Sequence, residues 1–130
     1  MKTIKVVAAI IEKDDHILVA KRNYGDYKDK WEFPGGKYEE NESGEQAIKR
    51  EISEEFDVKI NVKEYLCTVE HQYENFYLIM DCYICELINN DDLLLHDHSA
   101  IKWIDYNQDD IDLLPADINV LEKYREYLKG

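Results

Sequence analysis

The chain has 130 residues, of which 45% are apolar, so it is long enough to form one domain with a hydrophobic core. It carries 16 Lys and Arg residues against 29 Asp and Glu residues, which gives a formal net charge of −13. This charge repels DNA, RNA and anionic membranes, so we expect no nucleic-acid or membrane partner. A small polyanion would still bind where a divalent metal neutralised its site.

The first predicted elements are two strands, over residues 4–11 and 16–21, with a turn at residues 13–15. The first strand is interrupted by Lys5, is too short to span a bilayer and has no small-residue cleavage site after it. We therefore expect neither a signal peptide nor a membrane segment.

The polar residues 23–30 predict a loop, and Pro34 with the following glycines predicts an abrupt break. We expect a loop from Gly36 to about Ser43. Ser43 and Gln46 have the spacing of a capping box, so a helix is expected to start there and run to about Phe56.

The second half of the chain predicts strands over residues 58–70 and 76–86 and a short strand over residues 101–104. A helix is expected over residues 117–128. Its inner side would carry Ile118, Leu121, Tyr124 and Leu128. The expected fold class is therefore a mixed α/β arrangement with two helices and five to seven strands.

Three cysteines, Cys67, Cys82 and Cys85, form an odd and sparse set, which favours reduced thiols in a cytoplasmic protein. Cys82 and Cys85 have C-x-x-C spacing, but residues three apart on a strand face opposite sides of a sheet. A buried structural role is favoured over a metal or redox role.

The first predicted helix carries the acidic segment REISEEF, in which Glu51, Glu54 and Glu55 follow Arg50. Like charges three and four residues apart on a helix repel each other. Two explanations are open: a solvated acidic face, or a site for a hard cation such as Mg²⁺, which prefers carboxylate oxygens and substrate phosphates. The spacing alone does not decide between them.

The wider pattern places Glu42 after Gly36 with five residues between them, and the run from Arg50 to Val58 after Glu42 with seven residues between. It resembles the Nudix box, with one departure: Asp57 stands where the family has Gly. That position ends the helix in a left-handed conformation, which Asp tolerates better than most residues. We therefore expect a small loss of stability rather than a loss of activity.

The segments WEFPGGK and VVAAIIEKDDHILVAKR extend the resemblance to MutT-like Nudix members, which hydrolyse nucleoside triphosphates such as 8-oxo-dGTP and CTP. The resemblance covers residues 1–130, read as a single Nudix domain. It implies a mixed α/β (α+β) fold, with a β-sheet sandwiched between helices. It also implies attack by water on an internal phosphorus, giving a nucleoside monophosphate and pyrophosphate.

The resemblance assigns roles to several residues of this chain. Mg²⁺ or Mn²⁺ would be bound by Glu51, Glu54, Glu55 and the carbonyl of Gly35. Arg50 would orient the carboxylates, and Glu42 would support the same acidic site.

The general base stays open between Glu51 and Asp97, which resembles an acidic loop residue of relatives. An exposed loop carboxylate is the alternative for Asp97, and His96 and His98 are expected to be polar loop residues. Arg22 and Lys37 would contact substrate phosphate, or else be solvated cations.

The base of the substrate is assigned less directly. The segment LLPADIN resembles cytidine-type relatives, and an ionised Asp117 would accept a hydrogen bond from the amine of cytosine. A protonated Asp117 would donate to an oxo group, so 8-oxo-dGTP stays open, as does a capping role for Asp117. Tyr73, with Phe76 and Tyr77, would stack on the base or pack in the core, and Phe33 would lie at the edge of the pocket.

The expected partner is a small nucleotide, and the expected state is a monomer or homodimer. Two other functions are alternatives to this expectation. The first is a Nudix hydrolase of another diphosphate, such as ADP-ribose; the presence of prolines only at 34 and 115 argues against it. The second is a non-catalytic nucleotide-sensing module; the retention of every glutamate of the box argues against that.

Overall fold

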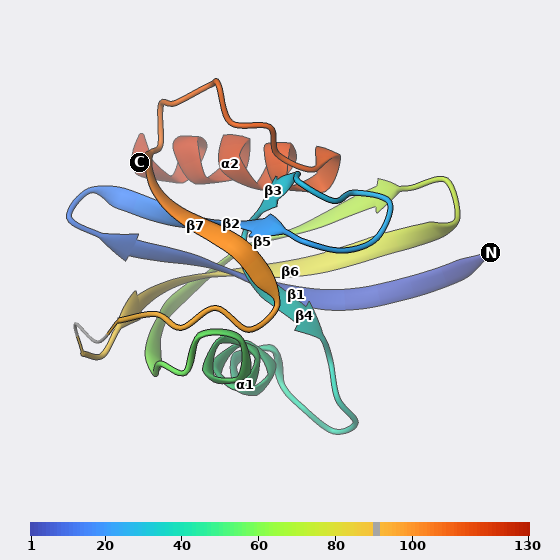
Figure 1. Cartoon of the computed structure of the whole chain (residues 1–130), viewed down its shortest axis with the longest axis horizontal. Helices are drawn as coiled ribbons and strands as arrows, with labels where there is room; N and C mark the ends of the chain where they lie inside the picture. The colour runs from blue at the N-terminus through green and yellow to red at the C-terminus, as the bar shows by residue number, and fades with distance from the viewer. Residues whose placement is uncertain (90–91) are drawn as a thin grey trace.

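The computed structural model describes residues 1–89 and 92–130, and there a mixed seven-stranded sheet lies between two helices (Figure 1). The strands are β1 (Lys2–Lys13), β2 (His16–Arg22), β3 (Trp31–Glu32), β4 (Gly35–Lys37), β5 (Ile60–Gln72), β6 (Phe76–Leu87) and β7 (His98–Asp105). The helices are α1 (Gly44–Phe56) and α2 (Pro115–Leu128), on opposite faces of the sheet. The predicted fold class is therefore confirmed.

β1 is the central strand, and its two edges have different partners. One edge pairs in parallel with β6 along nearly the whole strand, from Lys2 to Glu12. The other edge pairs with β2 only at Glu12 and Lys13, whereas β2 pairs with β7 along its whole length and with β3 at Ala20 and Lys21. The space opened between β1 and β2 is occupied by β4.

The predicted loop is present over residues 38–43, but its expected start at Gly36 was wrong, because Gly35–Lys37 pairs with Val6–Ala8 of β1. A Cβ atom on Gly35 would lie 1.9 Å from the carbonyl oxygen of Val7. Glycine is therefore used here for close approach of two backbones, and the Gly-Gly pair does not form a turn. This pairing brings the segment before α1 into the middle of the sheet.

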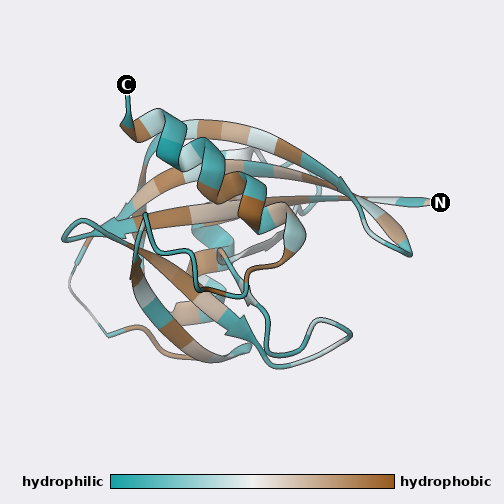
Figure 2. Ribbon diagram, turned by 90° about the horizontal axis from the view of Figure 1, so that it is seen from above, coloured by the Kyte–Doolittle hydropathy of each residue, from teal (hydrophilic) through white to brown (hydrophobic). Residues whose placement is uncertain are grey.

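Alternate residues of β1 build two separate core layers. Val7, Ala9 and Ile11 are buried in the layer beneath α1, whereas Ala8 and Ile10 are buried in the layer beneath α2. Figure 2 shows apolar segments of the strands running under α2. Each helix thus covers one face of the sheet.

The cysteines follow the same alternation. Cys82 belongs to the α2 layer and Cys85 to the α1 layer, and both are buried, so their expected placement on opposite faces is confirmed. Cys67 lies directly opposite Cys82 in the β5–β6 ladder.

Among the described residues, no helix is long and apolar enough to cross a membrane.

α2 begins at Pro115, two residues before its predicted start, and this changes which side chains face the core. Leu121 and Tyr124 are buried as predicted, but Ile118 and Leu128 are 50% and 41% exposed, so their assignment to the inner side was wrong. The buried stripe instead begins with Ala116 and includes Asp117.

α1 has the predicted capping box at its start. The Gln46 N–H donates to Ser43 Oγ at 3.2 Å, and the Ser43 N–H donates to Gln46 Oε1 at 2.9 Å. At the other end Asp57 has φ 59° and ψ 37°, and its N–H donates to the Ser53 carbonyl. The residue that replaces the family's Gly therefore adopts the left-handed conformation that glycine favours.

We expect Asp57→Gly to raise the free energy of unfolding by about 1 kcal/mol, because glycine enters the left-handed region without steric cost. Urea unfolding of the two proteins measures this difference. Asp57→Ala is the control and should be less stable than the wild type. Equal stability of the glycine and alanine variants would contradict the expectation.

Candidate functional site

A cleft of about 740 Å³ opens beside β4, between the acidic edge of α1 and the start of α2. Every residue predicted for the site lines this cleft except Glu42, Glu54 and Tyr77, and the first two contact it through Arg50. The residues brought together are Arg22, Phe33, Gly35, Lys37, Arg50, Glu51, Glu55, Tyr73, Asp97 and Asp117. Acidic groups gather toward α1, and aromatic and apolar side chains gather toward β6 and α2.

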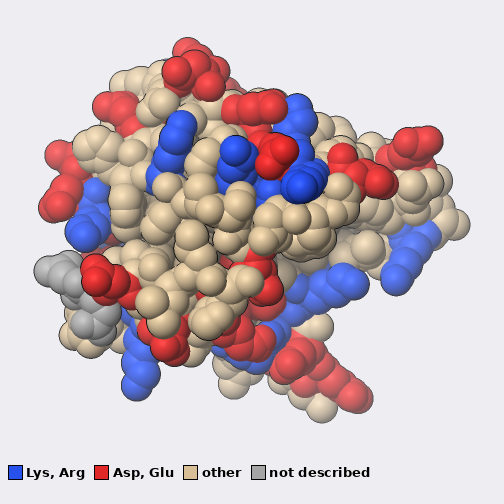
Figure 3. All heavy atoms as spheres, in the orientation of Figure 1, with Lys and Arg blue, Asp and Glu red and all other residues tan. Residues whose placement is uncertain are grey.

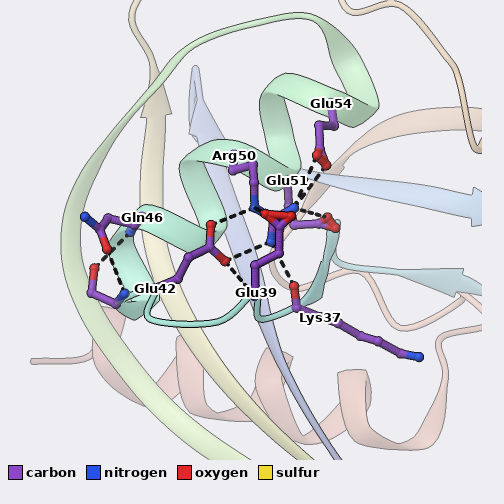
Figure 4. A network of polar contacts seen from close by, with 8 residues as sticks. Lys37, Glu39, Glu42, Gln46, Arg50, Glu51 and Glu54 are labelled. Atoms are coloured by element: carbon purple, nitrogen blue, oxygen red, sulfur yellow. Dashed lines mark hydrogen bonds and ion pairs between the residues drawn. The ribbon is translucent and has the colours of Figure 1, made fainter.

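Arg50 is the centre of a polar network that connects α1 with the segment before it (Figure 4). Its Nε and Nη2 donate to the two carboxylate oxygens of Glu42 at 2.7 and 2.9 Å. Nη1 donates to Glu54 at 3.0 Å and makes a longer contact of 3.4 Å with Glu51, and Nη2 also donates to the carbonyl of Lys37 at 2.9 Å. One guanidinium therefore fixes three carboxylates relative to β4.

These contacts also change the acidity of the groups concerned. The hydrogen bonds from Arg50 lower the pKa of Glu42, which stays ionised. They raise the pKa of Arg50 itself.

Glu51 points from α1 toward the backbone of β4. A Cβ atom on Gly36 would lie 1.9 Å from Glu51 Oε1, so the glycine leaves the space that the carboxylate occupies. Burial raises the pKa of Glu51 and the Glu54 carboxylate raises it further, whereas Arg50 lowers it.

Glu55 is the most deeply buried carboxylate of the acidic helix, with only 6% of its surface exposed. Burial, together with the nearby carboxylates of Glu51, Glu32 and Asp97, raises its pKa to about 9. Its Oε2 atom has no hydrogen-bond partner among the described residues. Closely spaced acidic groups with an unsatisfied oxygen are suited to a divalent cation, which would offset both their burial and their mutual repulsion.

The donor set is not already gathered around one point. In the described part of the chain, no three His, Cys, Asp or Glu side chains lie close enough to hold an ion between them. The Glu54 carboxylate is instead paired with Arg50, and its side chain is 54% exposed. Rotation of Glu54 away from Arg50 is therefore part of what a cation would require.

A chain of polar contacts that the sequence did not predict runs from Arg22 to Glu55. Arg22 Nη1 donates to Glu32 Oε1 at 2.8 Å, and His98 Nε2 lies 2.9 Å from the other oxygen of Glu32. His98 Nδ1 lies 3.6 Å from Glu55 Oε2. The prediction that His98 is a polar loop residue was wrong, because it begins β7 and is buried.

The sequence carried little signal for this contact. His98 and Glu32 lie 66 residues apart and meet only because β7 and β3 both pair with β2. Asp97, the neighbouring residue, is exposed and lines the cleft.

The other end of the cleft is built around Asp117. It is 4% exposed, and its Oδ1 accepts a hydrogen bond from the Phe33 N–H at 2.8 Å. The capping alternative is wrong in its strict form, because Leu114 occupies the N-cap position of α2. Burial and the nearby Glu32 raise the pKa of Asp117 well above its usual range, so burial favours the protonated acid.

The aromatic side chains differ in their access to the cleft. Tyr73 and Phe76 line it, stacked on each other with 5.0 Å between ring centres, and the Tyr73 hydroxyl accepts a hydrogen bond from the Ala116 N–H. Tyr77 is not part of the lining, and its hydroxyl donates to Glu70. Phe33 is 3% exposed, so it forms a packed wall.

Asp81, to which the sequence assigned no role, is used structurally. Its carboxylate accepts hydrogen bonds from the hydroxyls of Tyr38 and Thr68. These contacts connect β6 to the segment after β4 and to β5.

We expect Glu55→Gln to stabilise the protein at pH 8 in buffer without divalent ions. The ordinary pKa of the group is 4.5 and its folded value is about 9, so between these values unfolding releases a proton and stability falls as the pH rises. Glutamine is neutral throughout, so the advantage of the variant should grow from pH 5 to pH 8.

Thermal unfolding at several pH values measures this effect, with Glu45→Gln at an exposed position of the same helix as the control. A difference between wild type and Glu55→Gln that is the same at pH 5 and pH 8 would contradict the pKa shift.

Comparison with known proteins agrees with this geometry. The family model described as the NUDIX domain matches residues 1–124. The chain is 39% identical over 127 residues to the CTP pyrophosphohydrolase of Escherichia coli (strain K12), covering 95% of this chain and 93% of that protein. It is 32% identical over 88 residues to the 8-oxo-dGTP diphosphatase of Proteus vulgaris, covering 64% and 76% of the two chains.

Solved structures show the same fold. The solution structure of the E. coli ORF135 protein has a TM-score of 0.84 and 35% identity, covering 98% of this chain and 92% of that one. The crystal structure of a MutT Nudix hydrolase from Burkholderia pseudomallei has a TM-score of 0.86 and 25% identity, covering 95% and 98%.

Proposed function

Since the chain belongs to the Nudix family and is a MutT-like pyrophosphohydrolase, we propose that it hydrolyses nucleoside triphosphates of the CTP type to the monophosphate and pyrophosphate. The observation that carries the proposal is the cleft itself, which has the carboxylates of α1 at one end and the buried Asp117 at the other. A triphosphate would occupy the acidic end, and the base would lie against Phe33, Tyr73 and Asp117. Such hydrolysis would clean or regulate the nucleotide pool.

The proposed cofactor is Mg²⁺ or Mn²⁺, held by Glu51, Glu54, Glu55 and the carbonyl of Gly35. The residues fit this role because their donors are hard oxygens and because burial leaves Glu55 Oε2 unsatisfied. When bound, the ion would polarise the phosphates, lower the pKa of the attacking water and neutralise the leaving pyrophosphate.

The remaining polar residues would orient this site and the phosphates. Arg50 contacts Glu42, Glu51 and Glu54, and we assign it the role of orienting these carboxylates. Lys37 extends its side chain away from that network, where it would reach phosphate (Figure 4). Arg22 already donates to Glu32, so a phosphate would use its other N–H groups.

The general base is proposed to be Glu51 or Asp97. Both line the cleft, but they differ in environment, since Glu51 is partly buried and Asp97 is exposed.

A second candidate substrate, 8-oxo-dGTP, is favoured by the raised pKa of Asp117. A protonated carboxyl donates a hydrogen bond to an oxo group, whereas an ionised one accepts from the amine of cytosine. The Proteus vulgaris relative carries the corresponding activity in its name. CTP therefore requires an ionised Asp117, whereas 8-oxo-dGTP requires a protonated one.

The charge of the molecule supports a small substrate over a nucleic acid. The face drawn in Figure 3 carries separate groups of acidic and of basic side chains, and the formal net charge of the chain is −13. An extended polyanion would meet repulsion along such a surface. The monomeric or dimeric state and the cytoplasmic location remain predictions.

We expect Glu54→Gln to lower kcat by roughly 100-fold, because it removes a charged oxygen ligand from the proposed metal site. Pyrophosphate release from CTP with Mg²⁺ measures the effect. Glu45→Gln makes the same chemical change on the same helix outside the cleft and should keep the wild-type rate. Full activity in Glu54→Gln would falsify the metal assignment.

We expect Asp117→Asn to change the ratio of kcat/KM for CTP to kcat/KM for 8-oxo-dGTP by about tenfold. Asparagine keeps an oxygen that accepts from the Phe33 N–H but cannot ionise, so the base contact changes while the helix contact is retained. The measurement is a substrate panel on both proteins. An unchanged ratio would remove Asp117 from base recognition.

The same panel separates the proposed function from its two alternatives, an ADP-ribose hydrolase and a nucleotide-sensing module. ADP-ribose would give AMP and ribose 5-phosphate without pyrophosphate. A nucleotide-sensing module would bind nucleotide and release no product.

A further inference from the structure

His98 lies between the two halves of the proposed active site. Through Glu32 it connects to Arg22, the cation assigned to substrate phosphate, and through its other ring nitrogen it faces Glu55, a proposed metal ligand. These four side chains come from β2, β3, β7 and α1. No other described contact joins Arg22 to Glu55 by consecutive polar side chains.

The ring of His98 is held in a single orientation. Its side chain is only 4% exposed, and it stacks on Phe56 of α1 with 5.8 Å between ring centres and 11° between planes. Its backbone pairs with Arg22 at the point where the β2–β7 register shifts. A bulge of this kind re-aims a side chain, and here His98 is part of the lining of the cleft.

Only one end of the ring makes a hydrogen bond. Nε2 is 2.9 Å from Glu32 Oε2, but the 3.6 Å between Nδ1 and Glu55 Oε2 is too long. His98 Nδ1 and Glu55 Oε2 are both buried, and neither has a hydrogen-bond partner among the described residues. A buried polar atom without a partner is costly, so a facing pair of them calls for an explanation.

We propose that His98 is a positioning residue that fixes the metal-binding carboxylate Glu55 relative to the phosphate-binding pair Arg22–Glu32. The proposal rests on the proposed function, because it needs Glu55 to bind metal and Arg22 to bind phosphate. His98 touches neither substrate nor metal. It acts through Glu32 on one side and through Glu55 on the other.

Three substitutions of His98 test the contacts of its two ring nitrogens separately. His98→Phe keeps an aromatic ring against Phe56 and removes both nitrogens. His98→Gln places an amide near the position of Nε2, facing Glu32, and His98→Asn places one near the position of Nδ1, facing Glu55. His96→Gln, at an exposed position two residues away, is the matched control.

The measurements are the dissociation constant for Mn²⁺ alone, followed by electron paramagnetic resonance, and kcat and KM for CTP. For His98→Phe we expect the Mn²⁺ dissociation constant and KM each to rise about tenfold, the size typical of groups that orient a ligand. His98→Gln should recover KM but not Mn²⁺ affinity. His98→Asn should recover Mn²⁺ affinity but not KM.

Melting temperatures distinguish this role from a purely structural one. If all three variants are destabilised and lose kcat alike, with no separation of KM from Mn²⁺ affinity, the positioning role is wrong. It is also wrong if His98→Phe binds Mn²⁺ and CTP within twofold of the wild type. If the wild type releases no pyrophosphate from any triphosphate, the proposed function fails, and the Mn²⁺ affinities of the Phe and Asn variants still decide the contact with Glu55.

Discussion

One guanidinium, that of Arg50, stabilises the acidic edge of α1. Three carboxylates within two helical turns repel one another, and two of them are also partly removed from water, which raises the cost of ionisation. Arg50 offsets this by donating to Glu42 and Glu54 and contacting Glu51, while a fourth contact ties it to the backbone of β4. Glu55 lies outside its reach, and it is the carboxylate whose pKa is raised furthest in this helix.

The position of β4 makes this network part of the sheet. β1 and β2 pair at only two positions, so the ladder opens and admits Gly35–Lys37 beside β1. The backbone beneath the acidic helix is therefore held by strand pairing and not by a free loop. β2 and its partners β3 and β7 carry Arg22, Glu32 and His98 to the same cleft.

Local features of the fold and the site were predictable from the sequence. The capping box of α1, the left-handed Asp57 and the grouping of Arg50 with its glutamates depend on residues a few positions apart, where spacing determines geometry. The placement of Cys82 and Cys85 on opposite faces followed from the alternation of a strand in the same way.

Features that depend on distant partners were missed. The strand character of Gly35–Lys37 requires Val7, and the burial of His98 requires Glu32 and Phe56. The prediction of which side of α2 faces the core was wrong for a similar reason. The segment starts its helix at Pro115, and the tertiary contacts of Ala116 and Asp117 select the buried stripe in preference to the more apolar Ile118.

The contact between Gly36 and Glu51 restricts how such a site can change during evolution. The carboxylate fills the volume that any side chain at position 36 would need. A larger residue at position 36 would therefore push the Glu51 carboxylate, the far end of a flexible side chain, away from β4. That movement would take the carboxylate from its contact with Arg50, so bulk at position 36 would alter the acidic site through the orientation of Glu51.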